Sequence, residues 1–443
     1  MKRIILGILT LTCFLNACRK PVATDETISP DALAEVLSRS IEMMVHDVSN
    51  PPLAARFFSY IHLAGTLALN ANDMASAAIL DQLNGFPKDR PALNSAAHTE
   101  LSALLSMMEV SSRLQPSGES MRGLKKNFRD SCLKNGWSKQ RLDAAMARAD
   151  TVAKIIMAYA AADGYRKLSE RPVYAAKERK GYWYPTPPGY FPAVEPHFPL
   201  IRPFLIDSSA LEPFAIDDPV AYDEDSTSEF HRLTREVYDV ALRAEGRPEA
   251  AFWDCNPFAL QSSGHLMIGM KKISPGAHWM GISQIACRKA ALNFRQTLRV
   301  QTLVSMALMD AFWLCWREKY RTERIRPETA IRKLIDPTWE PFLQTPPFPE
   351  YPSGHSVAST AAATVLTDLF GDHFAYTDSV ERRYGLPDRS YPSFLAAARE
   401  ASLSRLYGGI HFRDGITQGQ KLGASYGRYF VGKMSIRELR PQQ

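Results

Sequence analysis

The chain contains little cysteine for its length, with six in 443 residues. Two of these, Cys13 and Cys18, fall in the N-terminal segment considered below. The other four match no zinc-ligand spacing, so the sequence predicts no zinc-finger type of site. They are Cys132, Cys255, Cys287 and Cys315. Their pattern leaves open whether they form disulfides or remain as buried free thiols.

The chain also lacks a long basic run and any nucleic-acid-binding motif. Its formal net charge of +6 is modest, so we expect no nucleic-acid partner. Hydrophobic residues make up 45% and charged residues 23%, an ordinary globular composition that allows one large domain or two smaller ones. There is no fixed-period repeat. We expect no stretch after the N-terminal segment to be long and apolar enough to span a membrane.

The first residues, MKRIILGILTLTCFLNAC, have the features of a secretion signal. Two basic residues precede a short apolar run and a small residue, and the run is short for a spanning helix. Leu15-Asn16-Ala17-Cys18 resembles a bacterial lipobox, although Asn16 replaces the usual small or hydroxyl residue. We predict a lipoprotein-type signal peptide over 1–17 and a protein exported to a bacterial cell envelope membrane, facing the periplasm or the outer membrane. Its only membrane attachment would be lipid on Cys18. A plain secretory signal or an uncleaved anchor is the alternative.

Apolar residues at three- and four-residue spacing predict an N-terminal helical region over 18–170. The pattern is clearest in DALAEVLSRSIEMMVHDV, ALNSAAHTELSALLSMMEVSSRL and SKQRLDAAMARADTVAKIIMAYAAADGY, with breaks at Pro51-Pro52, GFPKDRP and QPSGES. The passage GYWYPTPPGYFPAVEPHFPLIRPF follows. It excludes regular helix and central strand, yet its aromatic residues predict close packing. The helical pattern resumes near residue 226 without alternating strands. The predicted fold class is therefore all-α, with a catalytic domain over 171–443.

Three clusters carry the candidate chemistry, and the first lies in WREKYRTERIRPETAIR. Lys319 and Arg326 are two helical turns apart, so on a continuous helix they would share a face that attracts an anion. Pro327 suits the first turn of a new helix. A solvated basic face is the alternative for this cluster alone.

The second cluster is EYPSGHSVAS, residues 350–359, at the start of an alanine-rich helix expected to end at Gly371. The Ser353 hydroxyl and Gly354 amide would lie at the positive end of the helix, where an anion binds readily. Gly354 would let the backbone approach a ligand, and His355 adds a titratable ring. Ser353 as an ordinary N-cap is the alternative. The tripeptide also occurs at 263–265, where no proline precedes it and no convincing helix follows, so we interpret that copy as a chance recurrence.

The third cluster is SRLYGGIHFRDG. Arg405 ends a helical run, Gly408-Gly409 breaks it, and His411 follows. Arginine offers a planar fork that suits tetrahedral oxyanions. His411 is a candidate nucleophile or ligand, whereas a lone histidine is more often structural.

Together, Lys-x6-Arg-Pro, Pro-Ser-Gly-His and Ser-Arg-x5-His resemble the superfamily that joins vanadium-dependent haloperoxidases and type 2 phosphatidic acid phosphatases. The resemblance covers roughly residues 300–425, and YWYPTPPGYFPAVEPHF and FWDCNPF look like segments of bacterial haloperoxidase-type proteins. It implies a helical bundle with one pocket for phosphate or vanadate. By this resemblance His411 would bond vanadium or attack phosphorus, and His355 would be the general acid–base group. The oxygens would be bound by Lys319, Arg326, Ser353, Gly354 and Arg405.

Two aromatic residues help to distinguish a haloperoxidase from a phosphatase within the superfamily. Trp316 and Phe348 look like the residues on the halide side of fungal-type haloperoxidases, although core packing explains them equally well. They favour a vanadate-dependent haloperoxidase. We expect it to oxidise iodide or bromide more readily than chloride with hydrogen peroxide, with Lys319 polarising the peroxide. A histidine-nucleophile acid phosphatase acting on phosphomonoesters, with no cofactor, is the second hypothesis. A non-catalytic anion-binding lipoprotein is the third.

Two positions depart from the family pattern. An acid commonly stands four residues after the last histidine, where this chain has Gly415. Asp414 is one residue closer, so its role in orienting His411 is open. Ile325 precedes Arg326 where haloperoxidases often have tryptophan.

Overall fold

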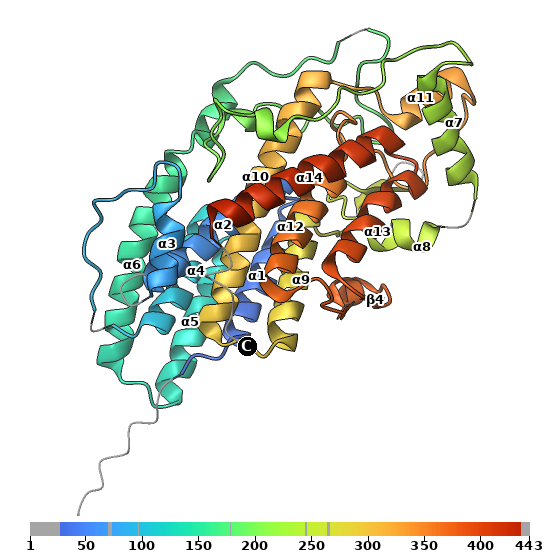
Figure 1. Ribbon diagram of the computed structural model, residues 1–443. Coiled ribbons are helices and arrows are strands. Elements are labelled where there is room, and N and C mark those ends of the chain that lie inside the picture. The colour runs from blue at the N-terminus through green and yellow to red at the C-terminus, as the bar shows by residue number, and fades with distance from the viewer. Residues whose placement is uncertain are drawn as a thin grey trace, which may run out of the picture.

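The computed structural model describes residues 27–69, 73–95, 97–177, 179–243, 246–263 and 266–435. The predicted signal peptide with Cys13 and the predicted lipidation site Cys18 lie outside these residues, as do Gly264 and His265. The described residues form a mainly helical protein, which confirms the all-α prediction (Figure 1). Its α-helices are α1 (Asp31–His46), α2 (Pro51–Leu69), α3 (Met74–Asp81), α4 (Thr99–Leu114), α5 (Glu119–Lys134), α6 (Lys139–Ala161), α7 (Glu229–Leu242), α8 (Arg247–Phe252), α9 (Pro275–Lys289), α10 (Phe294–Thr322), α11 (Pro327–Leu334), α12 (Gly354–Phe370), α13 (Phe394–Tyr407) and α14 (Arg413–Lys433).

Short 3-10 helices and two small hairpins complete the architecture. The 3-10 helices are η2 (Tyr165–Glu170), η3 (Phe198–Leu200), η4 (Glu212–Phe214) and η5 (Val380–Tyr384). The antiparallel hairpins pair β1 (Leu260–Ser263) with β2 (Leu266–Gly269) and β3 (Tyr376–Asp378) with β4 (Arg389–Tyr391). Strand β2 follows the second Ser-Gly-His, so no helix starts there.

Local sequence explains where several helices begin. Ser138, Ser228, Ser274 and Ser393 each accept a hydrogen bond from a backbone N–H in the first turn of the helix that follows. The chain does break at Pro51-Pro52 as predicted, but these prolines form the first turn of α2. Proline is tolerated there because a first-turn N–H has no partner within the helix.

Helix α10 is the centre of the bundle. It packs against α2 from the N-terminal part and against α9, α12 and α14 from the C-terminal part (Figure 1). Within the described ranges it is the single helix long and apolar enough to cross a membrane, which contradicts our prediction that no such stretch follows the signal segment. Because 94% of its most apolar window is buried inside the protein, its composition is that of a core helix.

One hydrophobic core extends through the N-terminal and C-terminal helices. It includes Leu63 and Leu104 as well as Leu303 and Leu366, all of which are fully buried. A second cluster joins α7, α11 and the start of α14 around Phe230, Ile331 and Phe412. This second cluster supports the loop that leads to α14.

The proline- and aromatic-rich passage packs against the protein, as predicted. Trp183, Phe198 and Phe204 are buried, and only short 3-10 turns occur there. The Trp183 N–H donates to the carbonyl of Glu323 at 2.7 Å, and the Val194 N–H donates to Pro347 at 3.1 Å. These bonds hold the passage against the ends of the segments that carry the first two motifs.

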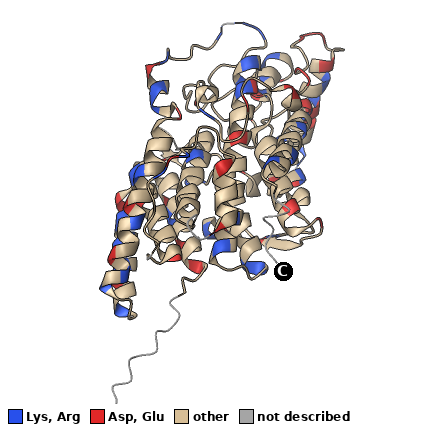
Figure 2. Cartoon of the chain, turned by 60° about the vertical axis from the view of Figure 1, so that its left-hand side comes forward, with Lys and Arg blue, Asp and Glu red and all other residues tan. Residues whose placement is uncertain are grey.

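Cys132, Cys255, Cys287 and Cys315 are all buried, and they form no disulfide with one another. Acidic and basic residues are interspersed along the outer helices (Figure 2). This even distribution is consistent with the modest net charge.

Candidate active site

Lys319 and Arg326 reach the site from two different helices. Helix α10 ends at Thr322, and Glu323 adopts a left-handed conformation with φ 48°. Arg326 is the residue before α11, whose first turn contains Pro327 as predicted. The two cations therefore do not share one continuous helix. They converge on the Phe348 ring, each 5.0 Å from its centroid.

Lys319 is fully buried, and its Nζ donates to three backbone carbonyls. The acceptors are Pro349 at 2.8 Å, Glu350 at 2.9 Å and Pro352 at 2.7 Å. These bonds attach the segment before α12 to α10. Burial lowers the pKa of Lys319 to about 7. Its charge is therefore sensitive to pH near neutrality.

Arg326 is held rigidly but keeps one unpaired donor. Its Nε donates to the Phe348 carbonyl at 2.8 Å and its Nη1 to the Ile410 carbonyl at 2.9 Å. Its Nη2 is buried without a hydrogen-bond partner in the described part of the chain. Burial lowers the pKa of Arg326 to about 10, so it stays protonated at neutral pH. Since an unpaired buried donor is costly, a bound anion would relieve this cost.

Ser353 begins α12 as its N-cap. Its Oγ accepts a hydrogen bond from the Ser356 N–H at 3.3 Å, and its own N–H donates to the Gly415 carbonyl at 2.9 Å. A Cβ on Gly354 would lie 3.7 Å from Trp316 and 4.0 Å from Lys319, which are ordinary contacts. Packing alone therefore does not require this glycine. Its missing side chain leaves open the space beside Lys319.

His355 presents an unpaired ring nitrogen. Its Nε2 is buried and has no hydrogen-bond partner among the residues that the structure covers. Burial and the nearby charge of Arg405 hold the pKa of His355 well below its usual range. The ring is therefore neutral at neutral pH and can accept a proton.

Arg405 lies near the end of α13. Its Nη2 donates to the Trp253 carbonyl at 2.7 Å, and its Nε donates to Ser404 Oγ at 3.0 Å. The predicted break follows, with Gly409 in the left-handed region at φ 76°. This turn brings His411 back toward Arg326.

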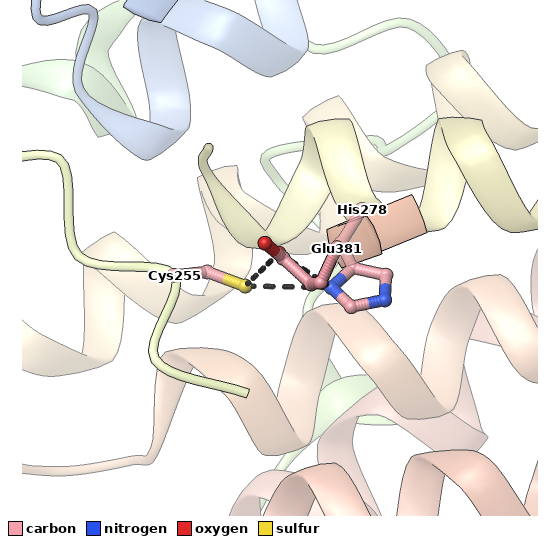
Figure 3. Close-up of side chains that lie close together, drawn as sticks. All are labelled: Cys255, His278 and Glu381. Carbon is pink, nitrogen blue, oxygen red and sulfur yellow. Dashed lines mark hydrogen bonds and ion pairs between the residues drawn. The ribbon is translucent and has the colours of Figure 1, made fainter. Parts of the chain in front are cut away.

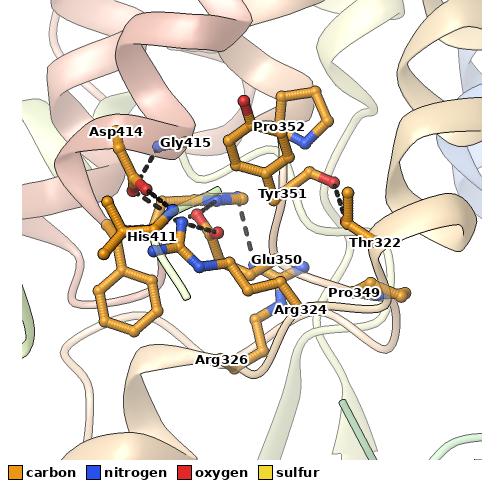
Figure 4. Close-up of polar contacts among 12 residues, drawn as sticks. Thr322, Arg324, Arg326, Pro349, Glu350, Tyr351, Pro352, His411, Asp414 and Gly415 are labelled. Atoms are coloured by element: carbon orange, nitrogen blue, oxygen red, sulfur yellow. Dashed lines mark hydrogen bonds and ion pairs between the residues drawn. The ribbon is translucent and has the colours of Figure 1, made fainter. Parts of the chain in front are cut away.

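His411 is oriented by Glu350, which our sequence analysis missed (Figure 4). Its Nδ1 lies 2.7 Å from Glu350 Oε1, so Nδ1 carries the proton and the lone pair is left on Nε2. Nε2 lies 3.2 Å from Arg326 Nη1. Burial and the charges of Arg326 and Lys319 hold the pKa of His411 well below its usual range. Nε2 therefore accepts a hydrogen bond from Arg326. Once this bond is released, a neutral imidazole with its lone pair on Nε2 can bind a metal or act as a nucleophile.

Glu350 occupies the space that a side chain at position 415 would need. A Cβ on Gly415 would collide with Glu350 Oε1 and lie 3.0 Å from its Cδ. Asp414 contacts Arg324 instead, with 2.7 Å between its Oδ1 and Arg324 Nη1. The same Nη1 lies 3.1 Å from Glu350 Oε2, so Arg324 joins the two acids. Asp414 thus orients His411 only through Arg324 and Glu350.

The signal for Glu350 was present in the sequence but weak. Glu350 stands directly before Tyr351-Pro352-Ser353, in the motif itself, but it is 61 residues from His411. No local periodicity links two residues so far apart.

One pocket collects the predicted residues from all three motifs. Its walls include Trp316, Phe348, Gly354, His355, Arg405 and His411. The Trp316 and Phe348 rings are 5.0 Å apart and provide an apolar side. Lys319, Arg326 and Ser353 are buried next to these lining residues. The arrangement is a cationic pocket with unpaired donors and one apolar wall, which suits an oxyanion next to a weakly hydrated substrate.

Comparisons with known proteins identify the family of the chain. The family model described as VCPO second helical-bundle domain matches residues 299–338 and 334–437. No curated protein sequence matches the chain. Among solved structures, a bacterial vanadium-dependent iodoperoxidase is 40% identical, with a TM-score of 0.86 over 93% of this chain and 98% of that one.

Two further structures share the fold at lower identity. A holo-type bacterial vanadium-dependent chloroperoxidase has 17% identity and a TM-score of 0.62, and covers 88% of this chain and 94% of its own. The apo-type chloroperoxidase has 16% identity and a TM-score of 0.63, and covers 88% of this chain and 96% of its own. The chain belongs to the vanadium-dependent haloperoxidase family, and it is an enzyme.

Proposed function

We propose that the protein is a vanadate-dependent haloperoxidase that oxidises iodide or bromide with hydrogen peroxide. The observation that carries this proposal is His411, which Glu350 holds through Nδ1 while its Nε2 lies 3.2 Å from Arg326 in a buried cationic pocket. A buried imidazole fixed in this tautomer is the usual form of a histidine metal ligand.

The residues of the pocket fit vanadate. Arg326 Nη2 is a buried donor without a partner within the described chain, so an oxyanion would satisfy it. His355 Nε2 is also buried and unpaired there, and it would accept from a protonated oxygen of the bound group. His411 Nε2 would bond the vanadium. The vanadate oxygens would be held by Lys319, Arg326, Ser353, Gly354 and Arg405. When bound, vanadate supplies the Lewis acidity that activates peroxide toward halide.

The side chains of the pocket support proton transfer and halide binding. His355 is neutral, so its Nε2 can take a proton from entering hydrogen peroxide and return it when water is released. Lys319 adds positive charge beside the reacting oxygens when it is protonated. Trp316 and Phe348 exclude water from one wall. Iodide and bromide hold their hydration less strongly than chloride, so entering this wall costs them less.

A phosphatase is the second candidate, because the same His411 lone pair could attack phosphorus. The two activities separate in one experiment on purified, vanadate-free protein. Orthovanadate is added, and oxidation of iodide, bromide and chloride by hydrogen peroxide is assayed beside hydrolysis of an aryl phosphate. We expect halide oxidation that depends on vanadate and is fastest with iodide or bromide. Efficient ester hydrolysis that vanadate inhibits, without halide oxidation, would decide for the phosphatase.

The non-catalytic hypothesis rested on the missing acid at position 415, and Glu350 removes that reason because it supplies the carboxylate to His411. We further propose that the enzyme is exported and lipid-anchored through Cys18. The support for this location is the N-terminal sequence.

A further inference from the structure

A second group of potential ligands lies buried at the wall of the pocket, which Cys255 lines. It consists of Cys255, His278 and Glu381, which are 2%, 0% and 6% exposed. Cys255 lies in the loop after α8, His278 in α9 and Glu381 in η5. Their side chains point toward one another from these three separate segments (Figure 3).

The separations of the three ligand atoms match a metal site. Cys255 Sγ lies 3.6 Å from His278 Nδ1, and Nδ1 lies 3.3 Å from Glu381 Oε1. Sγ and Oε1 are 3.9 Å apart. The point equidistant from the three atoms is about 2.1 Å from each, which matches zinc bonds to nitrogen and oxygen at about 2.0–2.2 Å. A small displacement of the ion away from Sγ would give the bond of about 2.3 Å that zinc forms with sulfur.

The imidazole of His278 is held from its other side. Its Nε2 lies 2.8 Å from Asp378 Oδ2, and Asp378 is itself fully buried and accepts the Val380 N–H at 3.0 Å. The Trp253 ring stacks on the imidazole with 4.5 Å between centroids. A carboxylate that accepts from the distal nitrogen of a histidine is a frequent outer partner of metal-bound histidines. The arrangement turns Nδ1 toward Cys255 and Glu381.

The charges of the group also favour a cation. No lysine or arginine in the described ranges forms an ion pair with Asp378 or Glu381, and their only ionic partner there is His278. Two carboxylates are thus buried around one imidazole, which leaves negative charge in a poorly solvated place. A divalent ion would be neutralised by its two anionic ligands, the Cys255 thiolate and the Glu381 carboxylate, and the Asp378 carboxylate would remain as the hydrogen-bond partner of His278.

We propose that Cys255 Sγ, His278 Nδ1 and Glu381 Oε1 bind a divalent metal ion of the zinc type, with a water molecule in the fourth position. Mixed sulfur, nitrogen and oxygen ligands favour zinc or cobalt over the harder magnesium and calcium ions. The site adjoins the proposed vanadate pocket, because Cys255 also lines that pocket, but it shares no ligand with the vanadate and does not depend on the proposed function.

The ion would act as a structural clamp on the wall of the pocket. Residues 255–258 line the pocket, and the Trp253 carbonyl accepts from Arg405 Nη2 at 2.7 Å. Binding Cys255 to α9 and to η5 would therefore fix the loop that supports Arg405. Metal loss should loosen this wall without removing any pocket residue.

The experiment uses untagged, vanadate-free full-length protein, depleted with a chelator, dialysed against micromolar Zn²⁺ and analysed for metal content. We expect one zinc per chain. With Co²⁺, thiolate-to-cobalt charge-transfer absorption should appear in the wild type. It should be absent in Cys255→Ala and retained in Cys287→Ala, which removes a buried free thiol from α9, the helix that carries His278. Asp378→Asn should weaken zinc binding about 10–100-fold while keeping the ligands.

Failure of the wild type to retain zinc would overturn the proposal, as would cobalt binding without the charge-transfer absorption. Equal zinc affinity in Cys255→Ala and Cys287→Ala would overturn it as well. If Cys255→Ala does not fold, the cobalt spectrum of the wild type and the affinity of Asp378→Asn still decide.

Discussion

Glu350 places its carboxylate where a side chain on Gly415 would otherwise stand. From this position it accepts from His411 Nδ1 at 2.7 Å and from the Phe412 N–H at 3.2 Å. The orienting acid of the histidine therefore comes from the segment before α12, and the absence of a side chain on α14 makes room for it.

We predict that Gly415→Ala damages the site although it only adds a methyl group. The new Cβ would displace the Glu350 carboxylate, so His411 would lose its fixed tautomer. We expect vanadate affinity and halide oxidation to fall about 10–100-fold, the usual effect of losing an outer partner of a metal ligand. Gly432→Ala is the matched control in the same helix, since a Cβ there meets no atom within 4 Å. It should be neutral or slightly stabilising. Equal activity of the two variants would contradict this role for Glu350.

Moving the orienting acid from position 350 to position 415 should restore part of the halide oxidation that is lost when Glu350 is removed. Glu350→Ala removes the orienting carboxylate, and we expect a similar loss of halide oxidation. Adding Gly415→Asp to Glu350→Ala places an acid at the position common in the family, in space that the first substitution has vacated. Steady-state kinetics of the double variant should recover above Glu350→Ala. No recovery, with the fold intact by circular dichroism, would mean that an acid from α14 cannot reach His411 in this chain.

Removal of His411 and removal of His355 should have different effects on vanadate binding, although both should abolish turnover. His411→Ala should abolish halide oxidation and any phosphatase turnover, while phosphate binding weakens less because Lys319, Arg326 and Arg405 remain. His355→Ala should abolish turnover and retain vanadate, measured by equilibrium dialysis. His265→Ala, in the second Ser-Gly-His, should leave turnover unchanged. Wild-type rates in His411→Ala would show that the site is assigned wrongly.

Anion binding should depend on pH through Lys319. Its pKa is lowered to about 7, and the ordinary value is 10.5. The folded protein therefore loses this charge as pH rises above 7. We expect affinity for sulfate, whose own charge is constant here, to fall by up to about tenfold per pH unit between pH 7 and 9. His355 and His411 are already neutral there, and Arg326 is still charged. Lys319→Met should bind sulfate weakly with a flat profile, and an unchanged slope in this variant would exclude Lys319 as the titrating group.

The lowered pKa of Lys319 also affects the free energy of unfolding. This free energy changes with pH in the opposite direction to the anion affinity. Between pH 7 and 10.5 the unfolded chain keeps the Lys319 proton and the folded chain does not, so the free energy of unfolding rises with pH in this window. Below pH 7 the buried charge destabilises the fold. Denaturant unfolding of the wild type and Lys319→Met at pH 6 and 9 should show a smaller difference between the two pH values in the variant.

The location proposal has its own test. Cys18→Ala should prevent lipidation and release the protein from the membrane fraction into a soluble fraction. The measurement is fractionation of cells that express the full chain, with Cys13→Ala as control. Membrane association that persists in Cys18→Ala would show that lipid on this cysteine is not the anchor.

The sequence by itself determined the helical class, and it predicted which groups react. Apolar periodicity marked α1, α6 and α12 because the buried face of a helix must be apolar. The three motifs predicted Lys319, Arg326, His355, Arg405 and His411 as site residues because an oxyanion pocket needs charges and nitrogen atoms that few residue types provide. These features depend only on residue type and on short spacing along the chain, so they can be predicted from a single sequence.

Only the tertiary structure decided how these groups are held. Glu350 reaches His411 across 61 residues, and Cys255 reaches Glu381 across 126. A turn at Glu323, instead of a continuous helix, brings Arg326 to the Phe348 ring. Such partners are fixed by packing between distant segments, because buried charge must find an opposite charge or a donor wherever the fold places one. The spacing of residues along the chain therefore does not predict which distant residues come into contact.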